Sequence, residues 1–127
     1  QTHHYELITD LARKMLVRAK EVTHKQYIEA HLTLIEARRE HDEFMAINAF
    51  DALLTPSTPG EAPLIKTTGD SVFNRVWTAL GVPAVHLPLA MGPTGLPLGV
   101  QLTGRSWRDG DLLASAALSE AAFNGDT

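Results

Sequence analysis

The sequence contains no cysteine, which excludes both a disulfide framework and a thiolate metal site. No apolar run approaches the ~20 residues that a membrane-spanning helix needs, and no signal-peptide pattern opens the chain. There is also no excess of positive charge, because the formal net charge is −4 and the acidic and basic residues are interspersed. We therefore expect no membrane span, no binding to nucleic acid and a cytoplasmic location.

The usual signatures of a self-contained catalytic site are missing as well. None of the serines lies in a G-x-S-x-G elbow or a Gly/Ser cluster, no histidine pair has the H-E-x-x-H spacing, and no phosphate-binding glycine loop is present. We interpret Ser57 and Ser71 as turn and cap residues, His41 as part of a solvated helix face and His86 as a satisfied core histidine. No lysine shows the neighbours that would lower its pKa for catalysis. No catalytic residue, metal or cofactor is expected.

What the sequence does have is the composition of an ordinary globular protein. Its 127 residues are 44% hydrophobic and 20% charged, which is typical of one soluble domain or a piece of one. The first residue is Gln1, and the opening residues already resemble the inside of a helix-forming stretch. Removal of a short leader would explain this, and so would excision from a longer protein. We predict a single partial domain over residues 1–127.

Two helices are predicted in the first part of the chain. Apolar residues recur at helical spacing from about Tyr5 to Ala19. Thr23 and Gln26 then form a capping-box pattern that starts a second helix, and neither proline nor glycine interrupts the chain before Phe50. The buried stripe of this second helix is predicted to consist of Tyr27, Ala30, Leu34, Ala37 and Phe44.

The second part of the chain alternates short strands with helices. The predicted elements are a strand at 50–55, a Pro-rich loop, a short helix capped by Asp70 or Ser71 and ending at Leu80, strands at 83–89 and 98–103, and a last helix at 109–123. Gly81 is suited to end the short helix in a left-handed conformation. The turn at 92–95 predicts that the last two strands form an antiparallel hairpin, and Gly99 and Gly104 favour a bulge or a close approach.

All three strands are apolar on both faces, as in a sheet that is covered on both sides. Three short strands do not make a well-protected sheet by themselves. The sequence therefore predicts that more chain, or a partner, completes this sheet.

Several segments together resemble the C-terminal region of the amidase-signature family. They are the D-x-L-L-x-P strand at 51–56, Ala62-Pro63, the G-x-P-A motif at 81–84, GLPLGVQLTG at 95–104, the D-x-x-L-L helix at 109–123, and Tyr27, Ala30 and Arg38 on the long helix. The resemblance covers nearly the whole chain, and GLPLGVQLTGR is its most specific part. It implies an α/β fold, the C-terminal portion of the amidase-signature fold, with helices flanking part of a mixed sheet that includes an antiparallel hairpin.

The family hydrolyses carboxamides or related C–N bonds through a Ser–cis-Ser–Lys triad. That triad lies upstream of the matched region, and no residue of this chain matches it. The resemblance implies instead that the short helix helps to line the pocket for a small-molecule amide. Ser71, Arg75 and Thr78 would face the substrate with Trp77 as their neighbour, although many relatives carry Asn in place of Thr78. A helix that only packs remains the alternative.

Two interpretations of function follow. In the first, the chain is a fragment of an amidase and is inactive without an upstream catalytic region, so that exposed apolar sheet surface leads to aggregation or a homo-oligomer. In the second, the chain is a stand-alone binding or assembly module that keeps an amidase-like fold without catalysis, and it would be monodisperse and unfold cooperatively.

Overall fold

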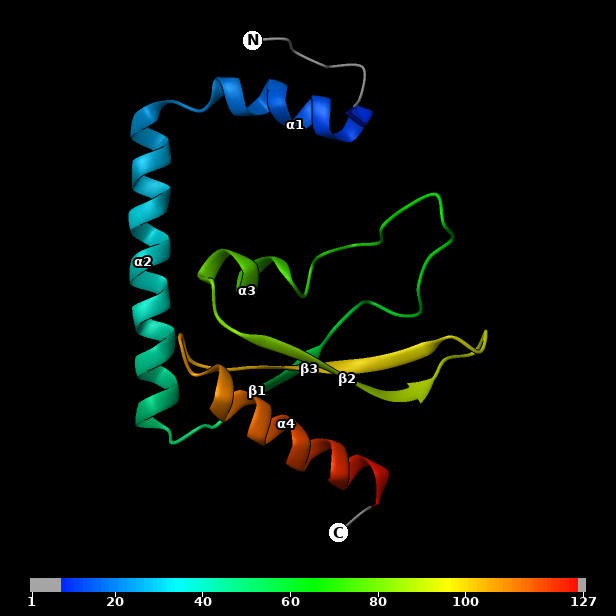
Figure 1. Cartoon of the computed structure of the whole chain (residues 1–127). Coiled ribbons are helices and arrows are strands. Elements are labelled where there is room, and N and C mark those ends of the chain that lie inside the picture. The colour runs from blue at the N-terminus through cyan, green and yellow to red at the C-terminus, as the bar shows by residue number, and fades with distance from the viewer. Residues whose placement is uncertain (1–7, 126–127) are drawn as a thin grey trace. The chain divides into compact units, whose positions relative to one another are not determined.

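A computed structural model describes residues 8–125 of the chain (Figure 1). Four helices and three strands alternate in the order that the sequence predicts. They are α1 (Asp10–Glu21), α2 (His24–Ile47), β1 (Leu53–Pro56), α3 (Arg75–Leu80), β2 (Ala84–Met91), β3 (Pro97–Thr103) and α4 (Asp109–Asn124). The chain divides into two compact units, Gln1–Thr33 and Leu34–Thr127, with the boundary inside α2.

The first unit contains α1 and the beginning of α2. The hydroxyl of Thr9 accepts a hydrogen bond of 3.3 Å from the backbone N–H of Ala12 and so caps α1. The predicted start of this helix, Tyr5, lies outside the described residues. The capping box that the sequence predicts for α2 is confirmed, because the backbone N–H of Thr23 donates to Oε1 of Gln26 and the N–H of Gln26 donates to Oγ1 of Thr23.

The predicted buried stripe of α2 is wrong. Met45 is the one buried residue of this helix. Tyr27, Leu34 and Phe44, which the spacing predicts to be buried, are all exposed. Helical spacing identifies which residues share a face, but burial also requires a neighbouring element to cover that face, and the spacing carries no information on this.

The second unit contains a three-stranded sheet in the order β1-β3-β2. The central strand β3 pairs antiparallel with both neighbours, so that Leu102 lies opposite Leu54 on one side and Val85 on the other. The predicted antiparallel hairpin of the last two strands is thereby confirmed. Every strand pair among the described residues is antiparallel, and the mixed sheet implied by the family resemblance stays a prediction.

Helix α4 packs on one face of this sheet (Figure 1). Leu87 and Leu102 from the strands meet Leu112 and Ala116 from the helix in one buried cluster. The last two lie at i and i+4, which puts them on the same face of α4. The Pro-rich loop and α3 lie against the other face, where buried Gln101 of β3 bonds to the carbonyl of Phe73. Both faces of β3 are therefore partly covered.

Two glycines have the roles that the sequence indicates. Gly81 ends α3 in a left-handed conformation, with φ of 64°. Gly99 lies beside a bulge in β2 between Pro88 and Ala90, and a Cβ added to it would lie 2.3 Å from the backbone oxygen of Leu87. Since that contact is to backbone, it could be relieved only by moving the strand.

No helix within residues 8–125 is both long enough and apolar enough to cross a membrane. Over the same residues, no three His, Asp or Glu side chains are grouped so that they could hold a metal ion.

We expect Gly99→Ala to lower the free energy of unfolding by about 1–3 kcal/mol, because the added methyl group overpacks the strand pair. Gly60→Ala is the matched control, since a Cβ at Gly60 meets nothing within 4 Å, and its effect should stay within about 0.5 kcal/mol. Urea denaturation followed by circular dichroism measures both. Equal stability of the two variants would contradict the close approach at Gly99.

Candidate functional site

The four residues predicted to line a pocket divide into two groups. Ser71 and Arg75 are brought together, because Nε of Arg75 donates to Oγ of Ser71 over 3.3 Å, and both side chains are exposed. Thr78 is exposed on the same short helix. Trp77 is half-buried, and its ring centroid lies 6.0 Å from that of His41 on α2. Ser71, Arg75 and Thr78 are therefore open to solvent, whereas Trp77 is turned toward α2.

The C-terminal end of α3 is held by an arginine. Nε of Arg38 on α2 donates a short hydrogen bond to the backbone oxygen of Leu80, one of the carbonyls that the helix leaves without an internal partner. The guanidinium also occupies the space that a side chain at Gly81 would need, because Nη2 lies 2.8 Å from the position of a Cβ there. Gly81 is thus required twice, for its positive φ and for the arginine. The sequence pattern singles out Arg38 but gives it no partner.

His41, near this contact on α2, is not on a solvated helix face as the sequence predicts, and neither is its neighbour Asp42. The His41 side chain is only 9% exposed, and its Nδ1 lies 3.2 Å from Oδ1 of Asp42. The same oxygen accepts a 3.0 Å hydrogen bond from the backbone N–H of Ser106. The sequence-based prediction fails because the ring of Trp77 lies beside His41 and the backbone of Ser106 bonds to Asp42, so that neither side chain is fully open to solvent.

These contacts set the charge of Asp42. Burial opposes ionisation of its carboxyl, but hydrogen bonding from Ser106, together with the hydrogen bond and charge of His41, outweighs it and holds the pKa of Asp42 below its ordinary value. Two ring nitrogens close by, Nε2 of His41 and Nε1 of Trp77, are buried without a hydrogen-bond partner. Buried polar atoms are normally satisfied by protein or ordered water.

A second set of polar contacts closes the Pro-rich loop at both ends. The amide of Gln101, which is 4% exposed, donates to the backbone oxygens of Pro56 at 3.1 Å and Phe73 at 2.9 Å. Nδ2 of Asn74 donates to the backbone oxygen of Ser57 over 3.1 Å. One side chain of β3 therefore fixes where the loop leaves β1 and where it returns toward α3. Gln101 is a polar residue between Val100 and Leu102 in β3, and this is the sequence signal that could have identified its role.

Ser57 and His86 form a serine–histidine pair, with Oγ and Nδ1 2.7 Å apart. Ser57 is buried, whereas His86 lies on an exposed strand position, so the prediction of a core histidine is correct only in that the ring has a partner. A nucleophile needs an oriented base and donors for the developing oxyanion. In the part of the chain that the structure describes, no hydrogen bond orients the other ring nitrogen, and what the pair is seen to do is join the start of the loop to β2.

Glu61 links the same loop to the β2–β3 turn. Its carboxylate accepts hydrogen bonds from Oγ1 of Thr94 at 2.6 Å and from the backbone N–H groups of Thr94 and Leu96. The hydroxyl of Thr94 is the main cause that lowers the pKa of Glu61; burial opposes it, and the backbone donors add to it. No sequence motif indicates this contact.

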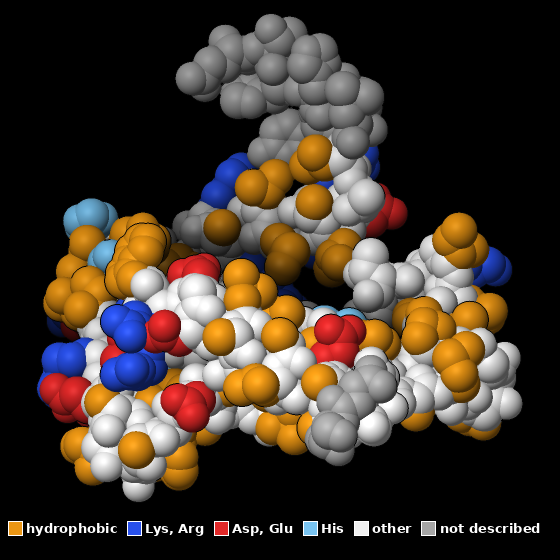
Figure 2. Space-filling view, turned by 60° about the horizontal axis from the view of Figure 1, so that its bottom comes forward, with side chains coloured by type: hydrophobic (Ala, Val, Ile, Leu, Met, Phe, Trp, Pro, Cys, Tyr) orange, Lys and Arg blue, Asp and Glu red, His pale blue; other side chains and the backbone are white. Residues whose placement is uncertain are grey.

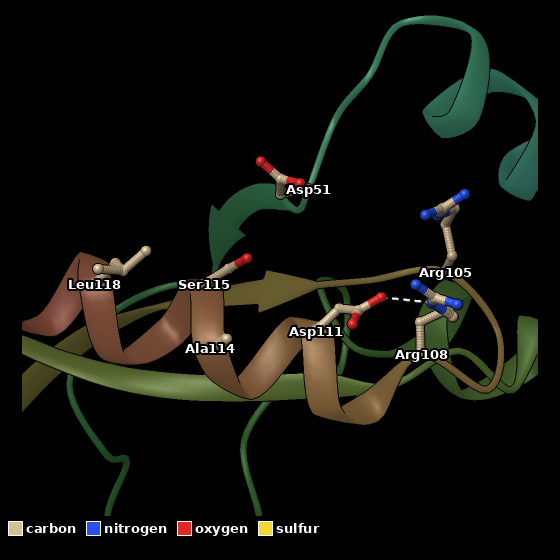
Figure 3. Close-up of a pocket in the computed structure, with 7 residues that line it drawn as sticks. All are labelled: Asp51, Arg105, Arg108, Asp111, Ala114, Ser115 and Leu118. Atoms are coloured by element: carbon tan, nitrogen blue, oxygen red, sulfur yellow. Dashed lines mark hydrogen bonds and ion pairs between the residues drawn. The ribbon is translucent and has the colours of Figure 1, made fainter.

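Two hollows lie along α4, and they are lined by none of the four predicted pocket residues. The first has a volume of about 410 Å³ and is bordered by Asp51, Arg105, Arg108, Asp111, Ser115 and Leu118, among others (Figure 3). Arg108 and Asp111 form an ion pair across one turn of α4. The second hollow, of about 420 Å³, shares Asp51, Ser115 and Leu118 with the first and extends toward Phe50 and Leu102.

We expect Gln101→Glu to increase amide hydrogen exchange across residues 57–74 and to destabilise the fold by roughly 1–3 kcal/mol, because a carboxylate at this buried position cannot donate to the carbonyls of Pro56 and Phe73. Glu120→Gln is a control for the change of charge at an exposed position on α4. Unchanged exchange in the loop would contradict the role of Gln101.

The lowered pKa of Asp42 predicts a pH dependence. Its contribution to stability is fully present above the ordinary aspartate value of 3.8 and is lost as the pH falls through the lowered value. The difference in unfolding free energy between the native chain and Asp42→Asn should therefore be constant from about pH 5 upward and shrink below about pH 4. Glu40→Gln, an exposed change on the same helix, should show no such trend. Denaturant melts at each pH provide the measurement.

Comparisons with known proteins agree with this architecture. The family model described as Amidase matches residues 4–113. The chain is 39% identical over 95 residues to the A subunit of the glutamyl-tRNA(Gln) amidotransferase of Dinoroseobacter shibae, and 42% identical over 93 residues to its counterpart from a Jannaschia species. Each match covers 67% of this chain and 19% of the relative. The chain thus spans about a fifth of the length of these relatives.

Solved structures give the same result. A crystal structure of an amidase matches 94% of this chain with a TM-score of 0.77 and 30% identity, and the match covers 30% of that protein. The A subunit of the Thermotoga maritima glutamyl-tRNA(Gln) amidotransferase matches 88% of the chain with a TM-score of 0.54; at 23% identity, this shows the fold alone. With the family model matching most of its length and the fold corresponding to part of an amidase, this chain belongs to the amidase signature family.

Proposed function

We propose that this chain is the C-terminal segment of an amidase-signature hydrolase, and that the intact protein hydrolyses a carboxamide or a related C–N bond. The main support is the match of residues 4–113 to the family at about a fifth of the length of full relatives. An amidase and an amidotransferase both break the C–N bond of an amide, and this shared step is the chemistry we assign to the intact protein. The 127 residues themselves contribute scaffold and pocket wall.

Arg75 and Thr78 on α3, together with Ser71 just before it, form the surface that we propose contacts the amide substrate. Their exposure supports this role, as does the hydrogen bond that joins Arg75 to Ser71. Trp77 would support that face from behind, because its ring packs beside that of a histidine on α2. The hydrogen bond from Arg38 fixes the other end of the helix. A helix of six residues would otherwise be marginal in water.

The proposed partner of this chain is the upstream catalytic region of the amidase fold. Both outer strands have one edge that no described strand pairs with, and an open edge is a ready template for another strand. Apolar side chains beside these edges are exposed, including Leu54, Leu89 and Met91, and hydrophobic side chains recur over the face in Figure 2. Surfaces of this kind on a folded chain mark an interaction site.

We expect the isolated chain to release no ammonia from simple carboxamides, and to support release when it is mixed with the remaining, upstream part of a family member such as the Dinoroseobacter shibae relative. The physical reason is that the upstream part would supply the nucleophile and this chain the missing strands. Gly99→Ala serves as the control for a damaged sheet and should reduce reconstitution. Turnover by the isolated 127 residues would overturn the proposal.

Light scattering distinguishes the other outcomes. The proposal is supported if the isolated chain associates and the upstream part reverses this association. The reason is that strands of the upstream part would then cover the open edges of β1 and β2. A monodisperse monomer that unfolds cooperatively and does not bind the upstream part would instead favour a stand-alone binding or assembly module, and would contradict it.

A further inference from the structure

One arginine of the second unit differs from all the others. Among residues 34–125, Arg38 bonds to a backbone carbonyl, Arg39 pairs with two glutamates, Arg75 bonds to Ser71 and lies near Asp70, and Arg108 pairs with Asp111. The guanidinium of Arg105 has no hydrogen bond or ion pair within the described part of the chain, although the residue is half-buried. A guanidinium that has lost part of its hydration without gaining a partner is destabilising.

The position of Arg105 shows what could satisfy it. It lies at one end of the first hollow beside α4, and Arg108 lies at the same end (Figure 3). Arg108 already forms an ion pair with Asp111. The positive charge available to a ligand at this end is therefore that of Arg105. The fork of N–H donors on a guanidinium matches the two oxygens of a carboxylate.

Asp51 borders the same hollow, is exposed, and makes no ion pair or side-chain hydrogen bond among residues 8–125. It lies on the segment before β1, across from α4 (Figure 3). Although Asp51 and Arg105 carry opposite charges and line one hollow, no ion pair joins them. Two unpaired charges of opposite sign on separate walls are complementary to a ligand that carries both charges itself.

The rest of the lining indicates that the ligand also carries an apolar group. Leu118, which is 75% exposed, borders both hollows, and Phe50 borders the second. The combined groove therefore continues from the charged end to an apolar one. Its first part alone, about 410 Å³, falls in the range of roughly 300–1,000 Å³ that is typical of small-molecule sites.

We propose that this groove binds a small zwitterion of the free α-amino-acid type, with its carboxylate on Arg105, its ammonium group on Asp51 and an apolar side chain toward Leu118. This site is separate from the face of α3 that we assign to the amide substrate and does not depend on that assignment. Binding requires no activity and is therefore testable on the chain by itself, at a concentration at which light scattering detects no association.

The test uses three probes of one shape: L-leucine, L-leucinamide, which lacks the carboxylate, and N-acetyl-L-leucine, which lacks the ammonium group. We expect amide chemical shifts around residues 105–118 to move with L-leucine, with a millimolar dissociation constant. Each of the other two probes should bind about tenfold more weakly, which is the effect of losing one good polar contact.

Two variants assign the contacts, and a third variant serves as a control. In Arg105→Gln, L-leucine should bind as weakly as L-leucinamide does, and in Asp51→Asn it should bind as weakly as N-acetyl-L-leucine does. Lys66→Gln removes an exposed cation from the Pro-rich loop and should change nothing. The ratios of the dissociation constants of the three probes are first measured on the native chain. They therefore test the proposal even if a variant is partly unfolded.

Equal affinity for L-leucine and L-leucinamide would overturn the proposal, as would the absence of any shift near α4 at tens of millimolar, roughly tenfold above the expected constant. A direct ion pair between Asp51 and Arg105 would also overturn it. That result would appear as a coupling between the two substitutions in unfolding free energy without any ligand.

Discussion

The two hydrogen bonds donated by the Gln101 amide carry the arrangement of the second unit. They join the central strand to Pro56, at the end of β1, and to Phe73, just before α3. The intervening loop is rich in proline and has little regular structure, so it has few backbone bonds of its own to hold it. If these two bonds were lost, the buried amide of Gln101 would be left without its two acceptors, and an unpaired buried donor costs more than the bonds themselves contribute. One side chain of β3 thus holds the chain that leads into α3, while Arg38 holds the other end of that helix.

Local features of this fold could be predicted from the sequence. The capping box at Thr23, the left-handed end of α3 at Gly81 and the antiparallel hairpin are each specified by residues that are close together in the chain. The steric requirement at Gly99 also follows from its place in a paired strand. In all these cases the physical cause lies within a few residues of the pattern, so the pattern is sufficient.

The contacts that position the candidate site could not be predicted in this way. Arg38 reaches a carbonyl 42 residues away, and Asp42 an amide 64 residues away. Each of these side chains lies on a helix whose polar residues are indistinguishable in spacing from a solvated face, which is why the pattern places His41 in solvent. Burial of a polar residue depends on what covers it. The four proposed pocket residues stay a prediction for the same reason, because the proposed substrate-facing surface would be completed by chain outside this segment.

The register of β3 is what allows the two faces of the sheet to serve different purposes. Side chains alternate along a strand, so Leu102 faces Leu112 and Ala116 under α4 while Gln101 faces the loop. A slip of one residue would exchange them, placing an amide in the apolar cluster and a leucine against two carbonyls. The bulge beside Gly99 opposes such a slip, since only glycine fits against the opposing backbone there. A ligand can change a distant surface only by favouring one of two conformations of the protein. Because β3 has a single register, a ligand in the groove beside α4 cannot shift this strand to a second one. The groove and the face of α3 should therefore bind independently.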